Sequence, residues 1–171
     1  MIYKNKQSGF TLLELLLYVS ISALFLFFIS IFLSFLLEAR VKNQVIAEVE
    51  QQGLQAMQTI TQTIRNSAII NSPTLGASTA SLSLNTYVVV NNPTVFDLSG
   101  TALRIKEGSA VAIFLTNSRV QISGLSFQNL SRAGTPGVIA VTFTLTYVNT
   151  SGRQEYNYQK TFKTSATLRQ P

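Results

Sequence analysis

One apolar segment, Phe10–Leu37, constrains this chain more than any other feature of its sequence. At about 1.5 Å per residue, the segment would form a helix roughly 42 Å long, whereas the hydrocarbon core of a bilayer is about 30 Å thick. Its only charged residue is Glu14. A carboxylate within such a segment is costly in lipid, and it therefore indicates a functional site. We expect a membrane-spanning helix with a functional carboxylate near its start.

The apolar segment follows a short basic leader, and two common kinds of N-terminal segment begin in this way. A secretory signal peptide has a shorter apolar region, of about 7–15 residues, and a small-residue cleavage site. Here the apolar run is longer, and no Ala-x-Ala site follows Leu37. A plain signal anchor is the second possibility. It stays open on physical grounds, although it gives Gly9 and Glu14 no role.

The junction Gly9–Glu14, with the letters GFTLLE, resembles the class III signal of type IV pilins and pseudopilins. This signal combines a glycine, an aromatic residue, a glutamate and a long apolar run without a gap. The resemblance implies that a membrane prepilin peptidase cleaves between Gly9 and Phe10 and then methylates the new amine of Phe10. It also implies that the leader, residues 1–9, lies on the cytoplasmic side of the membrane.

The same resemblance implies an assembly role for Glu14, whose carboxylate would meet the terminal amine of a neighbouring subunit. A charged pair in a medium of low dielectric interacts far more strongly than in water. An unpaired buried charge is heavily penalised. Glu14 would therefore fix the stagger at which subunits enter a filament.

Two further features favour a minor subunit over a major pilin. Many major pilins carry a helix-kinking proline in the apolar helix, but this chain has no proline between Phe10 and Ser72, so a straighter helix is expected. The tail, Phe162–Arg169, resembles the final strand of the larger minor pseudopilins of type II secretion, the J type, and of related minor pilins. The resemblance is specific over residues 4–37 and is a similarity of pattern elsewhere.

The helix is predicted to continue beyond Leu37 as an amphipathic half, residues 38–68. Apolar residues recur there at helical spacing, with Gly53 on the same stripe and polar residues mostly on the other faces. The stripe comprises Val41, Val45, Val49, Met57, Ile60, Ile64 and Ala68. We expect this stripe to pack on a sheet formed by the rest of the chain, and Gly53 to be the weakest point of the helix.

Pro73 and the small residues after it end the helical pattern, and residues 69–171 are predicted to form a β-rich globular region. The predicted strands are Ser83–Val90, Ala102–Lys106, Ala110–Thr116, Arg119–Ile122, Leu125–Leu130, Val138–Val148 and Tyr156–Thr164. The predicted core aromatics are Phe114, Phe127, Phe143, Tyr147, Tyr156 and Phe162. The predicted fold is therefore α+β and pilin-like: a long N-terminal α-helix, with residues 10–37 in the membrane, packed on an antiparallel β-sheet.

Composition argues against catalysis and against a metal site. The chain has no cysteine and no histidine, which excludes disulfides and thiolate ligands and removes the commonest general base. The seven carboxylates are scattered along the sequence. An anchored hydrolase would need a Ser–Lys arrangement, and Lys106, Lys160 and Lys163 stand in no such motif. We expect no catalytic residue, no cofactor and no metal.

The positive charge does not indicate a nucleic-acid partner. The net charge is +6, and removal of Lys4 and Lys6 with the leader would leave it at +4. The basic residues from Arg65 to Arg169 form no cluster along the sequence, so a solvated basic surface is the expectation. Two basic residues precede the apolar segment (Lys4 and Lys6) and two follow it (Arg40 and Lys42), so flanking charge does not indicate how the chain is oriented in the membrane. The expected orientation depends on the resemblance alone.

We therefore expect a non-enzymatic minor pilin or pseudopilin of a type IV pilus, a type II secretion system or a related filament. Its expected partners are the prepilin peptidase, other pilins or pseudopilins, the inner-membrane assembly platform and membrane lipid. It would cross the inner membrane once, with the β-rich region outside the cytoplasm, and then enter the filament. The alternative is a signal-anchored membrane protein whose β-rich region binds a ligand or another protein.

Overall fold

The computed structural model describes residues 11–169, which form one long helix followed by strands and two short 3-10 helices, η1 and η2. The elements are α1 (Leu12–Arg65), β1 (Ser67–Ser72), β2 (Ser78–Thr79), β3 (Leu82–Thr86), η1 (Val89–Asn91), β4 (Thr94–Ser99), β5 (Ala102–Glu107), β6 (Ile113–Phe114), β7 (Val120–Asn129), β8 (Val138–Tyr147), η2 (Gln154–Tyr156) and β9 (Gln159–Thr167). The chain divides into two compact units, here termed the stem, ending at Arg40, and the head, beginning at Val41.

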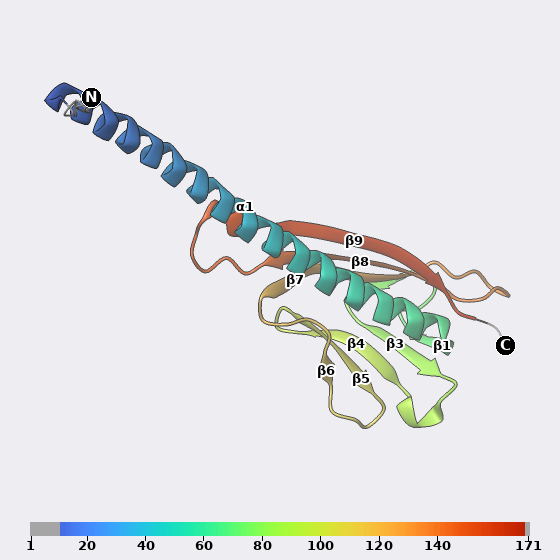
Figure 1. The fold of residues 1–171 in the computed structure, drawn as a ribbon. Helices are drawn as coiled ribbons and strands as arrows, with labels where there is room; N and C mark the ends of the chain where they lie inside the picture. The colour runs from blue at the N-terminus through green and yellow to red at the C-terminus, as the bar shows by residue number, and fades with distance from the viewer. Residues whose placement is uncertain (1–10, 170–171) are drawn as a thin grey trace, which may run out of the picture. The chain divides into compact units, whose positions relative to one another are not determined.

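The strands of the head form two antiparallel sheets (Figure 1). The first sheet has the order β1-β3-β4-β5-β6, and the second has the order β2-β7-β8-β9. The second half of α1 packs against both sheets, because its buried side chains belong to one core with theirs. The predicted fold class, a long N-terminal helix on antiparallel sheet structure, is thus confirmed, with two sheets where one was expected.

The head's core is built on one face of α1. The buried residues of α1 recur every three or four positions, which is the period of a helix: Val45, Val49, Gly53, Ala56, Ile60 and Ile64. Val49, Ala56, Ile60 and Ile64 share one core with apolar side chains that alternate along the strands, including Leu82, Leu84, Phe96, Phe127, Val141 and Phe143. Each such side chain contributes about 1.5–3 kcal/mol when fully buried. The predicted stripe is confirmed at Val45, Val49, Gly53, Ile60 and Ile64, whereas Val41 and Met57 are only partly buried and Ala68 is exposed.

Gly53 lies within this stripe and is buried. A Cβ atom added at Gly53 would overlap the ring of Phe162 on β9, so the missing side chain is what allows ring and helix to meet. Phe162 stacks in turn on Phe143 of β8, with ring centroids 5.6 Å apart. Gly53 was expected to weaken the helix, and in the structure it is also a position at which a side chain of β9 packs directly against α1.

The predicted aromatic core is only partly correct. Phe127, Phe143 and Phe162 are buried, whereas Tyr147 and Tyr156 are half-buried and stack on each other at 6.1 Å. The prediction for Phe114 is wrong, since its side chain is 58 % exposed. Phe114 lies on β6, a two-residue strand at the edge of its sheet, and no element covers it there.

Helix and strand boundaries also differ from the prediction. The helix ends at Arg65, and Ala68 lies in β1, although its spacing continues the helical stripe. The two strands predicted at Arg119–Ile122 and Leu125–Leu130 form one strand, β7, with an irregularity in register between Ser123 and Ser126. The strands β1, β2 and β4 were not predicted.

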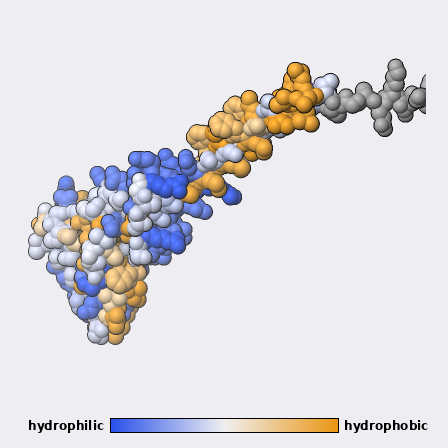
Figure 2. Space-filling view, turned by 90° about the vertical axis from the view of Figure 1, so that its left-hand side faces the viewer, coloured by the Kyte–Doolittle hydropathy of each residue, from blue (hydrophilic) through white to orange (hydrophobic). Residues whose placement is uncertain are grey.

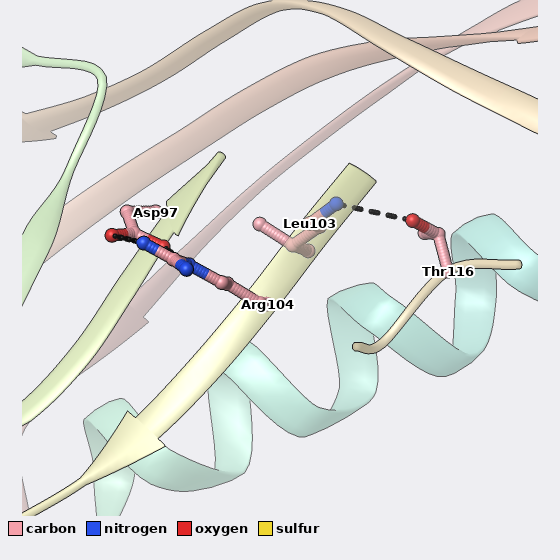
Figure 3. Close-up of polar contacts among 4 residues, drawn as sticks. All are labelled: Asp97, Leu103, Arg104 and Thr116. Carbon is pink, nitrogen blue, oxygen red and sulfur yellow. Dashed lines mark hydrogen bonds and ion pairs between the residues drawn. The ribbon is translucent and has the colours of Figure 1, made fainter. Parts of the chain in front are cut away.

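Two polar contacts hold β5 in the first sheet (Figure 3). Arg104 lies opposite Asp97 of β4, and its Nε and Nη2 groups donate to the two carboxylate oxygens at 2.5 and 3.0 Å. The hydrogen bond and the charge of Asp97 raise the pKa of Arg104. On the other side of β5, the N–H of Leu103 donates to Oγ1 of Thr116 at 3.1 Å. Thr116 is buried, so this hydroxyl satisfies a donor that water does not reach.

Replacing Thr116 with valine is expected to lower the free energy of unfolding by about 1–3 kcal/mol, because the N–H of Leu103 would remain buried without an acceptor. Thr116→Ser keeps the hydroxyl and serves as the control, with a loss of under about 1 kcal/mol. Urea unfolding of the full chain in detergent, followed by the near-UV signal of its tyrosines, measures both variants. Equal losses for the two would contradict the role assigned to the hydroxyl.

An ion pair joins β9 to α1 at the surface. Nζ of Lys160 donates to Oε1 of Glu50 at 2.6 Å. This contact lowers the pKa of Glu50 and raises the pKa of Lys160. A carboxylate with a lowered pKa stabilises the fold above its unfolded-state pKa, and the stabilisation is lost as pH falls through the lowered value. Because both side chains are exposed, the effect is small.

Candidate assembly site at the start of the stem helix

The stem presents apolar side chains on every side. All residues from Thr11 to Arg40 are exposed, and the large apolar ones from Leu12 to Leu37 are between 40 % and 79 % exposed. Figure 2 shows these apolar residues along the visible face of the stem. A helix that is apolar all round needs lipid or other helices around it. Among the described residues α1 is the one helix long and apolar enough to cross a membrane.

Two serines of the stem bond within the helix. Oγ of Ser20 donates to the carbonyl of Leu16 at 2.7 Å, and Oγ of Ser34 donates to the carbonyl of Ser30 at 3.1 Å. A hydroxyl in hydrocarbon has no water to bond with, so an internal acceptor removes most of its cost. These two polar side chains are therefore compatible with a lipid-facing stem.

Glu14 lies in the first turn of α1, and Thr11 caps that turn. The N–H of Glu14 donates to Oγ1 of Thr11 at 3.3 Å and to its carbonyl at 3.1 Å. The N–H of Leu15 also donates to the carbonyl of Thr11, at 3.2 Å. Threonine followed three residues later by glutamate is the capping-box spacing. This function of Thr11 was missed in the sequence, although the spacing of Thr11 and Glu14 carries the signal.

The capped turn explains how a carboxylate can begin such an apolar helix. The N-terminus of a helix carries a partial positive charge, which favours a nearby carboxylate. Glu14 is exposed, and within residues 11–169 no ion pair to it is formed. Gly9 and Phe10, the predicted cleavage and methylation site, lie outside the described residues.

The other candidate groups do not gather into a site. Within residues 11–169 no three His, Cys, Asp or Glu side chains lie close enough to hold a metal ion. Of the lysines considered for a Ser–Lys arrangement, Lys160 is ion-paired with Glu50.

Together, the α+β head and the apolar helix with its capped carboxylate define a membrane-anchored protein of pilin-like architecture. Residues 4–30 match the family described as the prokaryotic N-terminal methylation motif. This match and the long apolar helix support the pilin and pseudopilin superfamily and a membrane-anchored subunit of the type IV pilin kind. The match does not extend into the head. No curated protein and no solved structure matches the chain.

Proposed function

We propose that this chain is a minor pilin or pseudopilin, a structural subunit of a type IV pilus, a type II secretion system or a related filament. The observation that carries the proposal is the methylation motif at residues 4–30, which runs into a helix exposed and apolar on all sides with one carboxylate in its first turn. A soluble protein would bury such a surface, whereas lipid or a bundle of sibling helices would cover it.

In this proposal, prepilin peptidase removes residues 1–9 by cleaving between Gly9 and Phe10, and it then methylates the amine of Phe10. Residues 10–37 cross the inner membrane, residues 38–65 form the amphipathic part of the helix, and the β-rich region that begins with β1 at Ser67 lies outside the cytoplasm. The leader would thus remain on the cytoplasmic side, where the peptidase acts.

Glu14 would pair with the methylated amine of Phe10 on a neighbouring subunit. At about 4 Å and an effective dielectric constant of about 20, two unit charges attract by about 4 kcal/mol. A subunit entering at the wrong stagger would leave Glu14 unpaired among apolar helices, which is heavily penalised. The pair therefore selects one stagger between neighbouring subunits, and this selection does not depend on the head.

The choice of a minor subunit is supported by the absence of proline from the apolar segment and by the tail Phe162–Arg169, which resembles the final strand of minor pseudopilins of the J type. The proposed partners are other pilins or pseudopilins, the inner-membrane assembly platform and membrane lipid. Nucleic acid is not among them, because the basic residues of the head are dispersed along the sequence.

The test is to express the chain in cells that hold a prepilin peptidase, an assembly platform and a major pilin, and then to shear filaments from the surface. The proposal predicts the chain in the sheared fraction only when the platform is present. A signal-anchored protein would stay in the membrane fraction under both conditions, and that result would replace the proposal with the alternative.

A further inference from the structure

A hollow of about 520 Å³ lies on the head at the end of α1. Its lining includes Arg65 and Arg169, and also Tyr87 and Val88, which follow β3 in the chain. This volume is in the range of sites that hold small groups or a short segment of chain. Nothing in the proposed assembly role at Glu14 uses this hollow.

The backbone fixes the two arginines next to each other. The N–H of Arg169 donates to the carbonyl of Arg65 at 3.1 Å, which joins the end of the β9 segment to the last residue of α1. The hydroxyl of Tyr87 donates to the carbonyl of Arg169 at 3.2 Å. Arg65, Asn66 and Arg169 also line a second hollow of about 500 Å³. The arginine side chains therefore border both hollows.

The charge of the hollow is positive. Neither Arg65 nor Arg169 forms an ion pair within residues 11–169. Glu107 also lines the hollow, so the described lining residues carry two guanidinium groups and one carboxylate, a net charge of +1. The planar donor fork of arginine matches a carboxylate or a phosphate group through two parallel hydrogen bonds. The hollow is thus suited to an anionic group.

Tyr87 and Val88 give the lining of the hollow an apolar part, and two more exposed valines follow Val88 in the chain. Val88, Val89 and Val90 are 56 %, 80 % and 79 % exposed. The N–H of Gly108 donates to the carbonyl of Asn91 at 3.1 Å, which brings the loop after β5 beside these valines. In the same sheet, the loop after β5 and the edge strand β6 carry the exposed side chains of Val111, Ile113 and Phe114.

We refer to residues 88–90 and 111–114 as the apolar ledge. In Figure 2 apolar residues gather at the lower end of the head, which in Figure 1 is the end formed by the loops after β3 and β5. Exposed apolar patches next to polar groups mark surfaces that bind other proteins.

We infer that this hollow and the ledge bind a segment of a partner protein in which a carboxylate stands among apolar side chains. The carboxylate of the segment would pair with the two arginines, and apolar residues of the same segment would cover the ledge. A free anion would cover the hollow but leave the ledge exposed. This binding site lies on the head and is independent of cleavage at Gly9, so its failure and the failure of the proposed function can be told apart.

The test uses the full chain in lipid nanodiscs and two capped tripeptides, acetyl-Leu-Glu-Leu-amide and acetyl-Leu-Gln-Leu-amide. Backbone amide shifts in NMR report where each peptide binds. For ligands of this size we expect the glutamate peptide to bind with a Kd of about 1–10 mM and to shift the amides of Asn66, Tyr87 and Val88. The glutamine peptide should bind about 10-fold more weakly, because it lacks the charge-assisted hydrogen bonds.

Variants separate the two halves of the site. The double variant Arg65→Gln, Arg169→Gln should remove the difference between the peptides, and Val88→Ser should weaken both peptides about threefold. Arg132→Gln, at an exposed arginine that lines neither hollow, is the matched control and should change nothing. Unchanged shifts elsewhere in each spectrum show that a variant is folded.

Three results would overturn the inference. They are equal affinity for the two peptides, an unchanged preference in the double arginine variant, and inorganic phosphate binding to the same amides as tightly as the glutamate peptide. The last result would identify a general anion site without the apolar half.

Discussion

Gly53→Leu is expected to lower the free energy of unfolding of the head by about 3 kcal/mol or more. Leucine is a better helix former than glycine by nearly 1 kcal/mol, so helix propensity alone predicts that the substitution raises the free energy of unfolding. In the structure, however, any Cβ at Gly53 overlaps the ring of Phe162, and we therefore expect the free energy of unfolding to fall. That ring cannot simply swing away, since it is itself stacked on Phe143 inside the core.

The measurement is urea unfolding of the full chain in detergent, with Gln55→Ala on the exposed face of α1 as the control for helix propensity. A smaller substitution, Gly53→Ala, allows a double-mutant cycle with Phe162→Leu. Removing part of the ring should relieve the overlap, so the double variant should be more stable than the sum of the single effects by about 0.5–3 kcal/mol. Additive effects would contradict the proposed contact between helix and ring.

Glu14→Val is expected to reduce the amount of chain in sheared filaments by about 10-fold or more, the ratio that corresponds to about 1.4 kcal/mol. Cleavage of the leader should continue. The variant removes the carboxylate that would meet the terminal amine of a neighbour, while the apolar surface of the stem is retained. Quantitative immunoblots of the membrane and filament fractions give the ratio.

Glu38→Val is the matched control, because Glu38 is an exposed carboxylate near the far end of the stem unit. This control should enter filaments as the unchanged chain does. If Glu14→Val entered filaments normally, the register role of Glu14 would be excluded even if the chain is a pilin. If both variants failed equally, the loss would reflect the stem's general properties and not the position of the charge.

Much of the fold was predictable because its signals are periodic. The stripe from Val45 to Ile64 repeats at the helical period, and the alternation in β8 marks every second residue as buried. The end of α1 was harder to predict, because Ala68 continues the spacing of Ile60 and Ile64. The structure ends the helix at Arg65 instead, and Oγ of Ser67 donates to the carbonyl of Thr63 at 2.6 Å.

Strands that are stabilised mainly by pairing with residues distant in the sequence could not be predicted from their own residues. The short strand β2 comprises Ser78 and Thr79, which pair with Gln128 and Phe127 of β7. Small polar residues of this kind are typical of loops, and only the pairing makes them a strand. The close contact of Gly53 with Phe162 is likewise invisible in the sequence, where a glycine within a helix indicates only a cost.

The two candidate sites also differ in how far they could be predicted from the sequence. The motif from Gly9 to Glu14 is contiguous, so it could be recognised by resemblance, and the capping role of Thr11 follows from its spacing to Glu14. The hollow on the head could not be found, because Arg65 and Arg169 are brought together only by the bond between the ends of α1 and the β9 segment.

The most direct test of the central claim is the intact mass and N-terminal sequence of the protein, expressed with and without a prepilin peptidase. The proposal predicts a product that begins at Phe10 and carries one added methyl group, formed only when the peptidase is present. A chain that keeps its leader under both conditions would contradict the proposed processing and favour a simple membrane anchor.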